Sequence, residues 1–278
     1  MLAQLVLNTR SRRGHEAAPQ VRDALARAGI TVVEDGWPAE IAPEADCIIS
    51  AGGDGTLLRT IDTAIARGLP IGVIPLGTFN ELARTLELPL DIEGAVRTIA
   101  AAHERTIDVA RVNGTPFVNE ASIGISSRIT RLQTPELKQR FGAFGIVATA
   151  FQAFRHARPI HVDVEHDGEC ERLRTVQLTV ANSHRFGGLV SVADAAIDDG
   201  WLDLYSVDIR SLHQAFAVAR AIFGGKRTQA DGLRTIRARA FTLRTKHAHR
   251  ITADGEPAGV TPARFELEPK ALRVYVPQ

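Results

Sequence analysis

Apolar runs and helical spacing alternate along the first hundred residues of the chain. Short apolar or β-branched runs, typical of buried strands, lie at residues 4–7, 30–33, 46–51 and 71–74. Helical spacing of apolar residues predicts helices over residues 15–28, 57–66, 81–86 and 92–102. In the first of these, Ala17, Val21 and Leu25 recur every four residues, and Gly29 follows as a helix stop. Because strands separated by helices pair in parallel, this half is predicted to form an open α/β sheet.

The pattern changes near residue 105, where turn signals between strands replace helical spacing. Asn-Gly at 113–114 and Asp-Gly at 167–168 favour β-hairpins, and strand-like runs flank them at 109–112, 116–120, 160–165 and 173–181. Further strands are predicted at residues 202–207, 235–245, 250–253 and 265–276, with helices at 137–155 and 211–223. The second half is therefore predicted to be mostly antiparallel β, with a domain boundary near residue 106.

Composition and charge narrow the class of protein. The 278 residues suffice for one large domain or two ordinary ones, and 33 Lys and Arg against 32 Asp and Glu argue against a general nucleic-acid binder. Cys47 and Cys170 are too few for a disulfide framework and lack zinc-ligand spacing. The N-terminus lacks the basic region of a secretory signal. The most apolar later run, residues 141–154, is too short to span a bilayer, so we expect a cytoplasmic protein whose membrane association is peripheral.

The most specific chemical feature is the string GGDGT at residues 52–56, between a predicted buried strand and a helix. Its three glycines let the backbone approach a bulky anion, and the helix start offers free N–H groups to phosphate. Asp54 would repel phosphate unless a divalent cation lay between them, as in phosphoryl transfer. The alternative is a plain strand-to-helix turn. The string is not a Walker A loop, because no Gly-Lys-Ser/Thr follows it.

Two other strand-to-helix loops carry similar polar groups. Residues 75–80, PLGTFN, follow the next strand, and the Thr78 hydroxyl can bind phosphate; the alternative is that Asn80 alone caps the next helix. Residues 8–14 follow the first strand and offer the Asn8 amide with hydroxyl and guanidinium groups; a solvated basic loop is the alternative. Open α/β sheets bind ligands at the carboxyl ends of their strands, so the two glycine-containing loops are predicted to line one crevice.

Two acidic turns lie in the β half. Both strings, DDG at residues 198–200 and DGE at residues 254–256, fit an ordinary β-turn, in which Asp and Gly are common. The string DGE at residues 254–256 holds two carboxylates on a tight turn, and Pro257 restricts its exit. A carboxylate at the edge of a phosphate site could take a proton from an attacking hydroxyl.

These segments, in this order, resemble the diacylglycerol kinase catalytic family, in particular its soluble bacterial lipid kinases; sphingosine kinases and, more distantly, NAD kinases share the architecture. The matching segments are GGDGT at 52–56, PLGTFNELARTLELP at 75–89, IDVARVNGTPFVNEASIG at 107–124, DAAIDDGWLDL at 194–204 and TADGEPAG at 252–259. The resemblance implies an N-terminal nucleotide-binding open α/β domain, residues 1–106, followed by an antiparallel β-sandwich domain for lipid and metal, residues 107–278. It also implies an active site between the two domains.

The resemblance further implies roles for individual residues. Contacts to ATP are expected at Asn8, Gly52, Gly53, Asp54, Gly55, Thr56, Leu57 and Thr78. Glu256 would accept the proton of the attacking hydroxyl, and Asp54, the second catalytic residue, would coordinate Mg²⁺ directly or through water. A structural magnesium would be held by the side chain of Asp199 and by the backbone carbonyls of Ala196 and Trp201.

The chain departs from the family pattern at three places. The first loop reads NTRS at residues 8–11 where the family has Asn-Pro-x-Ser-Gly, and VADA at 192–195 replaces Ala-Pro-x-Ala. LLR at 57–59 replaces Leu-Asn-Glu, which removes an amide and a carboxylate. None of these changes removes a carboxylate that the chemistry needs.

Together the residues and the resemblance predict an ATP-dependent lipid kinase that phosphorylates a hydroxyl of diacylglycerol or a related lipid. The alternatives are an NAD kinase-like enzyme with a small soluble acceptor, and a non-catalytic regulator that binds nucleotide or lipid. The expected partners are ATP and a lipid at a membrane surface, without nucleic acid; the oligomeric state is left open, with a homodimer as one option.

A basic segment could bring the protein to an anionic membrane. Residues 220–250 carry nine Lys and Arg against Asp231 alone, a net charge of +8 (nine minus one). Each such charge near an anionic surface contributes about 1 kcal/mol of attraction. The alternative is an ordinary solvated face, or pairing with acidic residues elsewhere in the chain.

Overall fold

The structure, a computed structural model, describes residues 1–35, 41–125, 158–183, 185–186, 190–191, 196–211, 214 and 231–278. They form two compact units, Met1–Val109 with Glu268–Gln278, and Ala110–Leu267. Strands β5 (Glu104–Val112) and β18 (Ala263–Tyr275) run from one unit into the other. The domain division expected at residue 106 stays a prediction, and no sequence signal indicated that residues 268–278 return to the first unit. The predicted helix 137–155 and nearly all of the predicted helix 211–223 lie outside the described residues.

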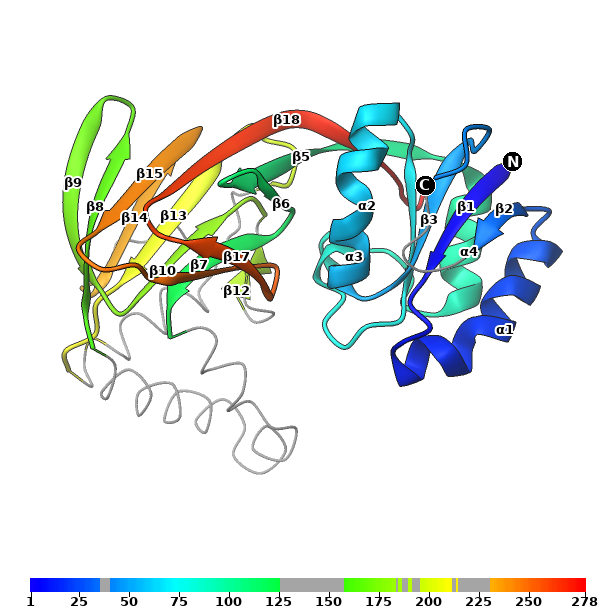
Figure 1. Cartoon of the computed structure of the whole chain (residues 1–278), viewed down its shortest axis with the longest axis horizontal. Coiled ribbons are helices and arrows are strands. Elements are labelled where there is room, and N and C mark those ends of the chain that lie inside the picture. Colours follow the sequence, from blue (N-terminus) through cyan, green and yellow to red (C-terminus); the bar gives the residue numbers. More distant parts are fainter. Residues whose placement is uncertain are drawn as a thin grey trace. The chain divides into compact units, whose positions relative to one another are not determined.

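The first unit is an α/β fold built on parallel strands. Its other elements are β1 (Leu2–Leu7), α1 (Arg12–Arg27), β2 (Thr31–Asp35), β3 (Cys47–Gly52), α2 (Asp54–Arg67), β4 (Ile71–Pro75), α3 (Glu81–Thr85) and α4 (Ile92–Ala101). The strand order is β2-β1-β3-β4, all parallel, and the end of β18 adds beside β4 in parallel. Figure 1 shows α1 and α4 on one side of these strands and α2 on the other. The alternation of strands and helices along the sequence is thus confirmed.

Helices on both sides explain why the parallel strands are apolar throughout. Every residue of β3 is buried, because one set of its side chains faces each helical layer. On one side, Leu5 and Leu7 of β1 share a buried cluster with Val21 and Leu25 of α1 and with residues of α4. The sheet is therefore fully buried at the carboxyl ends of β1, β3 and β4, from which the polar loops emerge.

The second unit is a sandwich of two antiparallel sheets. Its other strands are β6 (Thr115–Phe117), β7 (Glu120–Gly124), β8 (Ile160–His166), β9 (Glu169–Thr175), β10 (Gln177–Ala181), β11 (Arg185–Phe186), β12 (Val190–Ser191), β13 (Leu202–Val207), β14 (Leu233–Ala238), β15 (Ala240–Thr245), β16 (Arg250–Ala253) and β17 (Glu256–Val260). One is the antiparallel part of a ten-stranded sheet that β18 shares with the parallel strands, and it contains β18-β15-β8-β9 with β5 and β6. The other has the order β14-β13-β10-β7-β16-β17. Phe241 and Phe265 from the first sheet and Leu178 and Leu204 from the second belong to one buried cluster.

Three runs that the sequence pattern predicts as single strands are each divided in the structure, and one of them, 116–120, divides between β6 and β7. The predicted strand 173–181 breaks after Thr175, where the chain passes from the sheet of β9 to the sheet of β10. The Thr175 hydroxyl lies 2.7 Å from the carbonyl of Gln177 and 3.1 Å from that of Val207, and the Val176 N–H donates to Val207 (2.8 Å). The predicted strand 235–245 divides at Arg239, between β14 and β15. An apolar run carries no signal of such a change of sheet.

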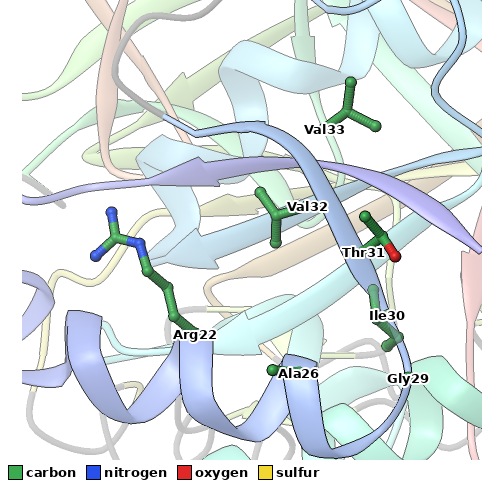
Figure 2. A pocket seen from close by; sticks show the side chains of 7 residues that line it. All are labelled: Arg22, Ala26, Gly29, Ile30, Thr31, Val32 and Val33. Atoms are coloured by element: carbon green, nitrogen blue, oxygen red, sulfur yellow. The ribbon is translucent and has the colours of Figure 1, made fainter.

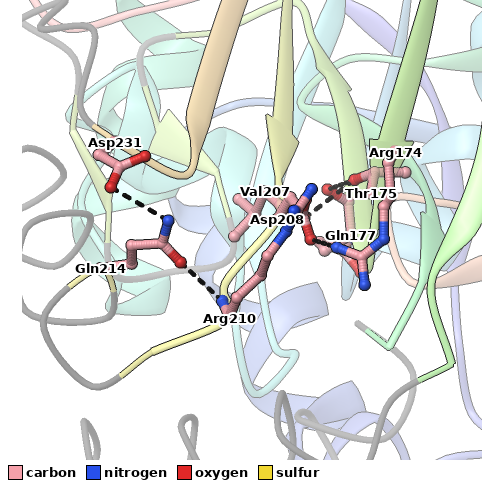
Figure 3. A network of polar contacts seen from close by, with 8 residues as sticks. All are labelled: Arg174, Thr175, Gln177, Val207, Asp208, Arg210, Gln214 and Asp231. Atoms are coloured by element: carbon pink, nitrogen blue, oxygen red, sulfur yellow. Dashed lines mark hydrogen bonds and ion pairs between the residues drawn. The ribbon is translucent and has the colours of Figure 1, made fainter.

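Polar side chains hold the strand ends around this crossing (Figure 3). The carboxylate of Asp208, which follows β13, pairs with Arg174 of β9 and with Arg210 (2.7 Å). The N–H of Arg210 donates to Gln214 Oε1 (2.8 Å), and the Gln214 amide donates to Asp231 (3.1 Å). The network therefore joins the ends of β9 and β13 to the segment that leads into β14.

Replacing Thr175 with valine should lower the free energy of unfolding, because a methyl group cannot donate to the carbonyls of Gln177 and Val207. Leaving a buried hydrogen-bonding group without its partner costs about 1–3 kcal/mol. Thr175→Ser keeps the hydroxyl and should retain most of the stability. Urea denaturation followed by circular dichroism measures both variants. If the valine variant were as stable as the wild type, the crossing would not depend on this hydroxyl.

Candidate active site

Two strand-to-helix loops of the first unit lie against each other at the carboxyl ends of β3 and β4. The N–H of Leu76 donates to the carbonyl of Gly52 (2.8 Å). A Cβ atom added at Gly77 would lie 2.6 Å from the Cα of Gly53, and one added at Gly53 would lie 3.2 Å from the Cα of Gly77. The glycines of the GGDGT string and of the 75–80 loop therefore permit a contact between the two backbones. Larger residues at these positions would push the loops apart.

Asp54, in the first loop, binds the start of α3, the helix that follows the second loop. It is the first residue of α2, and its Oδ1 accepts the N–H of Glu81, the first residue of α3, at 2.9 Å. Burial raises the pKa of the Asp54 carboxyl, and backbone N–H groups at Glu81 and Leu82 oppose that rise. A buried carboxylate in this state is stabilised by any cation that comes close, so Asp54 fits a role as a cation partner.

Asn80 does not cap α3 with its side chain. Its backbone is left-handed, with φ 48°, and its side chain bonds back to Gly77: the Gly77 N–H donates to Oδ1 (2.9 Å), and Nδ2 donates to the Gly77 carbonyl (3.0 Å). The alternative interpretation of this loop, in which Asn80 alone caps the helix, is therefore wrong. Asp54 supplies an acceptor at the helix start instead, and Thr78 is exposed at the tip of the closed loop.

The first loop joins the same edge of the sheet. The N–H of Asn8 donates to the carbonyl of Ala51 (3.1 Å), and the Arg13 guanidinium donates to the carbonyl of Gly77 (3.2 Å). Ser11 begins α1 as its N-cap, with its hydroxyl accepting the N–H of Gly14 (3.0 Å). The structure thus brings Asn8, the GGDGT string and the 75–80 loop to one edge of the first unit.

Within the GGDGT string, burial separates the residues that a ligand could reach from those it could not. Gly53, Asp54 and Gly55 are half-buried, whereas the side chains of Thr56 and Leu57 are buried in the unit. The cavity beside Asp54 measures about 10 Å³, which is space for about one water molecule. A nucleotide at this edge would therefore contact the loop surface, and any contact from Leu57 would come from its backbone.

A larger hollow of about 630 Å³ lies elsewhere in the first unit, between α1 and β2 (Figure 2). It is lined by Arg22 and Ala26 of α1 and by residues 29–33. These residues include one charged side chain and no carboxylate, and they surround the beginning of β2 rather than its carboxyl end. Ligands of open α/β sheets bind at the carboxyl ends of strands, so the loops, and not this hollow, form the candidate site.

In the second unit, the DGE string forms the hairpin turn between β16 and β17. Asp254 and Gly255 both have positive φ, 45° and 85°, as a tight primed turn requires. The Asp254 carboxylate accepts the N–H groups of Val118 (2.7 Å), Asn119 (3.0 Å) and Glu120 (2.9 Å). Asp254 thereby anchors the turn to the segment before β7, and Glu256 is left exposed at the start of β17. An exposed carboxylate on an anchored turn is suited to proton transfer.

Asn119 is a polar residue at this turn that the sequence reasoning did not select. Its side chain is fully buried, and neither its amide oxygen nor its amide nitrogen has a hydrogen-bond partner in the described part of the chain. In the sequence, Asn119 was marked only by its position inside the matching segment 107–124. That position does not predict that its side chain is buried.

The DDG turn lies just before β13. The carboxylate of Asp199 accepts the N–H groups of Ala196 (3.3 Å) and Trp201 (3.0 Å) and also pairs with the guanidinium of Arg237. These residues do not fit a divalent cation unless Arg237 moves away. Over the ranges that the structure describes, no three His, Cys, Asp or Glu side chains gather where they could hold a metal ion.

Much of the basic segment 220–250 is neutralised or lies outside the described residues. Three of its arginines pair with carboxylates from elsewhere in the chain: Arg234 with Glu171 (2.9 Å), Arg244 with Glu165 (2.8 Å), and Arg237 with Asp199. Residues 220, 226 and 227 are not described. The pairing favours the alternative to a membrane-docking face. None of the described helices is long and apolar enough to cross a membrane.

Two family models together match nearly the whole chain. Residues 3–112 match the diacylglycerol kinase catalytic domain, and residues 119–276 match the YegS C-terminal NAD kinase beta sandwich-like domain. The chain belongs to the diacylglycerol kinase family. The resemblance drawn from the sequence is thereby confirmed, and membership of this family makes the protein a kinase, which is a transferase.

Individual relatives agree with the family match. Diacylglycerol kinases of Staphylococcus epidermidis and Staphylococcus aureus are each 27% identical to this chain, over 238 and 235 residues, which is 84% of this chain and 75% of theirs. A crystal structure of a diacylglycerol kinase from Bacillus anthracis has a TM-score of 0.75 at 23% identity, covering 99% of this chain and 96% of that one. An NAD kinase from Archaeoglobus fulgidus in complex with ATP has a TM-score of 0.55 at 17% identity, covering 99% and 93%. The predicted fold class of this kinase, an α/β domain followed by antiparallel β, is confirmed.

Gly77→Ala should destabilise the kinase, because the new Cβ would meet the Cα of Gly53 and the Oδ1 of Asn80, each at 2.6 Å. Overpacking of this kind costs about 1–3 kcal/mol. Gly53→Ala is the matched control: its Cβ would lie 3.2 Å from Gly77, so it should cost less. Urea midpoints compare the stability of the two variants. Equal losses of stability would show that the closer approach of the Cβ at Gly77 does not decide the cost.

Asp54→Asn should make the folded protein at least as stable as the wild type at neutral pH. The folded-state pKa of Asp54 is raised by burial above that of the unfolded chain, so ionisation of this carboxyl lowers the free energy of unfolding as pH rises between the two pKa values. Asparagine cannot ionise and keeps an oxygen for the Glu81 N–H. The advantage should shrink as pH falls through the folded-state pKa and vanish below the unfolded one.

Urea midpoints over a pH series test this expectation, with Asp54→Ala as the control that lacks an acceptor for the Glu81 N–H and should be less stable than Asp54→Asn. A clear loss of stability in Asp54→Asn at neutral pH would mean that the ionised carboxylate stabilises the apoprotein.

Proposed function

We propose that this protein is an ATP-dependent lipid kinase that phosphorylates a hydroxyl of diacylglycerol or a related lipid, met at a membrane surface. The observation that carries the proposal is the contact between the GGDGT loop and the 75–80 loop, in which the half-buried Asp54 of the first loop binds the N–H of Glu81, directly after the second. Curated relatives named diacylglycerol kinase, at 27% identity, support the choice of lipid.

The loops of the first unit would hold the phosphates of ATP. Gly53 and Gly55 are partly accessible and carry no side chain to block an approaching phosphate, and Thr78 presents an exposed hydroxyl. Asp54 would hold, directly or through water, the Mg²⁺ that accompanies ATP. When bound, that ion neutralises charge on the transferring phosphoryl group. The burial that raises the pKa of Asp54 makes a nearby cation favourable, so the Asp54 carboxylate fits the role of a ligand for Mg²⁺.

Glu256 would accept the proton as the lipid hydroxyl attacks. The hydroxyl oxygen forms a bond to the γ-phosphorus, the bond from that phosphorus to the β,γ-bridging oxygen breaks, and ADP leaves with the bridging oxygen. The hydroxyl proton passes to the Glu256 carboxylate. Asp254 would not take part in this transfer, because three backbone N–H groups already occupy its oxygens and fix the turn that carries Glu256.

The similarity to an NAD kinase fold supports a second candidate function, that of a kinase with a small soluble acceptor. The purified chain should be incubated with γ-labelled ATP and MgCl₂, with diacylglycerol in mixed micelles, with NAD, or with no acceptor. Label that enters the organic phase only with diacylglycerol supports the proposal. Label on NAD supports the second candidate, and no transfer to either acceptor would favour a non-catalytic binding protein.

Glu256→Gln should lower kcat for the lipid by about 10²–10⁴-fold, the usual size of general-base assistance, while the KM for ATP stays nearly unchanged. Glutamine keeps the shape of the side chain but cannot accept the proton. Glu169→Gln is the matched control, since Glu169 is likewise exposed at the start of a hairpin strand. A Glu256→Gln defect confined to ATP binding would move this residue from proton acceptor to nucleotide or metal ligand.

A further inference from the structure

The turn before β13 closes around the carboxylate of Asp199. Its Oδ1 accepts the N–H of Trp201 (3.0 Å), and its Oδ2 accepts the N–H of Ala196 (3.3 Å). These two residues are the ones whose carbonyls the family resemblance assigns to a structural magnesium. The turn therefore already has an acceptor at its centre that binds its own backbone.

A guanidinium from the neighbouring strand adds a full positive charge to this centre. Arg237 of β14 stands directly opposite Asp203 of β13 and hydrogen-bonds to Oδ2 of Asp199. Its Nε lies 3.7 Å from Oδ1 of Asp203, a second ion pair. The side chains of Asp199 and Asp203 are only 21% and 10% exposed. One guanidinium thus balances two carboxylates that are largely removed from water.

The ring of Trp201 holds this guanidinium in place. The Arg237 guanidinium carbon lies 5.7 Å from the ring centroid, and that of Arg239 lies 5.2 Å from it. Both distances are within the range of a cation–π attraction, which orients a planar guanidinium over an aromatic face. Asp199 and Trp201 of the turn that would hold the metal, together with Asp203 of β13, therefore surround the Arg237 side chain.

A magnesium ion at this turn would compete with that arrangement. Mg²⁺ demands near-octahedral oxygen ligands at about 2.0–2.1 Å and gives up its water reluctantly. Binding to Asp199 would place its charge beside the guanidinium or would displace it, and a displaced guanidinium leaves its partner carboxylates largely buried without it. We propose that Arg237 takes the place of the divalent cation in this chain, so that the Asp199 turn is folded and stable without metal.

The proposal concerns the second unit alone and does not rest on the proposed function, because its test reads thermal stability without nucleotide. The melting temperature Tm of the full chain is measured in EDTA and in millimolar MgCl₂ at constant ionic strength, for the wild type and for Asp199→Asn. The difference between their magnesium-induced shifts reports magnesium that binds through Asp199, whatever the ion does elsewhere. We expect that difference to be zero.

Arg237→Met should lower Tm by about 5 °C, because it removes the guanidinium that pairs with two poorly exposed carboxylates. In this variant magnesium should regain part of the loss, and Arg237→Met/Asp199→Asn should abolish the recovery. Arg239→Met is the matched control: it removes a cation over the Trp201 ring but keeps the Asp199–Arg237 pair, so its magnesium-induced shift in Tm should equal that of the wild type.

Three results would overturn the proposal. One is a wild-type Tm that rises with magnesium more than that of Asp199→Asn, which decides the matter even if Arg237→Met does not fold. The second is an Arg237→Met variant as stable as the wild type. The third is a folded Arg237→Met variant that is destabilised but gains nothing from magnesium.

Discussion

The contact between the backbones at Gly53 and Gly77 is the constraint on which the candidate site depends. Parallel pairing of β3 and β4 delivers both loops to one edge of the sheet, but side chains at these two positions would hold the loops apart. With glycine at both, the loops meet, Asp54 reaches the N–H of Glu81, and α3 begins where the second loop ends. The close approach thus places a carboxylate, free loop surface and the Thr78 hydroxyl within one small region.

Three aspartates of the matching segments share one physical role, which is to accept backbone N–H groups. Asp54 binds the start of α3, Asp254 binds three successive N–H groups before β7, and Asp199 binds two N–H groups of its own turn. A carboxylate so bound is fixed in position, and its charge remains available to a cation or a guanidinium. Glu256, in contrast, is exposed and carried on a turn that Asp254 anchors. Positioning and proton transfer are therefore divided between neighbouring acidic residues of one string.

The charge that balances each of these aspartates differs. Asp199 has a guanidinium beside it and an aromatic ring that holds that guanidinium, so its turn carries its own cation. Within the described residues, the hydrogen bonds to Asp54 come from backbone N–H groups, and burial raises the pKa of its carboxyl. This contrast is the reason why magnesium is proposed at the phosphate loops and not at the Asp199 turn.

The strands and helices of the first unit followed from the sequence, because burial on both faces of a parallel sheet imposes apolar runs and the intervening helices impose a 3.6-residue period. The GGDGT string and the DGE turn were also identified from the sequence, since glycines at a helix start favour phosphate binding and two carboxylates on a tight turn are typical of a proton acceptor site. The contact of the two glycine loops was expected in outline, because the strands before them are neighbours in the sheet.

Only the tertiary structure decided which residues distant in the sequence contact these side chains. The break after Thr175 depends on the carbonyl of Val207, which lies 32 residues away, and an apolar run looks the same on either side of it. The burial of Asn119 and the bonds from residues 118–120 to Asp254 join positions more than 130 residues apart. Arg237 looked like one member of a basic run until strand pairing set it against Asp203 and Asp199. Local patterns determine local conformation and loop chemistry, whereas the charge and hydrogen bonds around a side chain depend on which distant strand lies beside it.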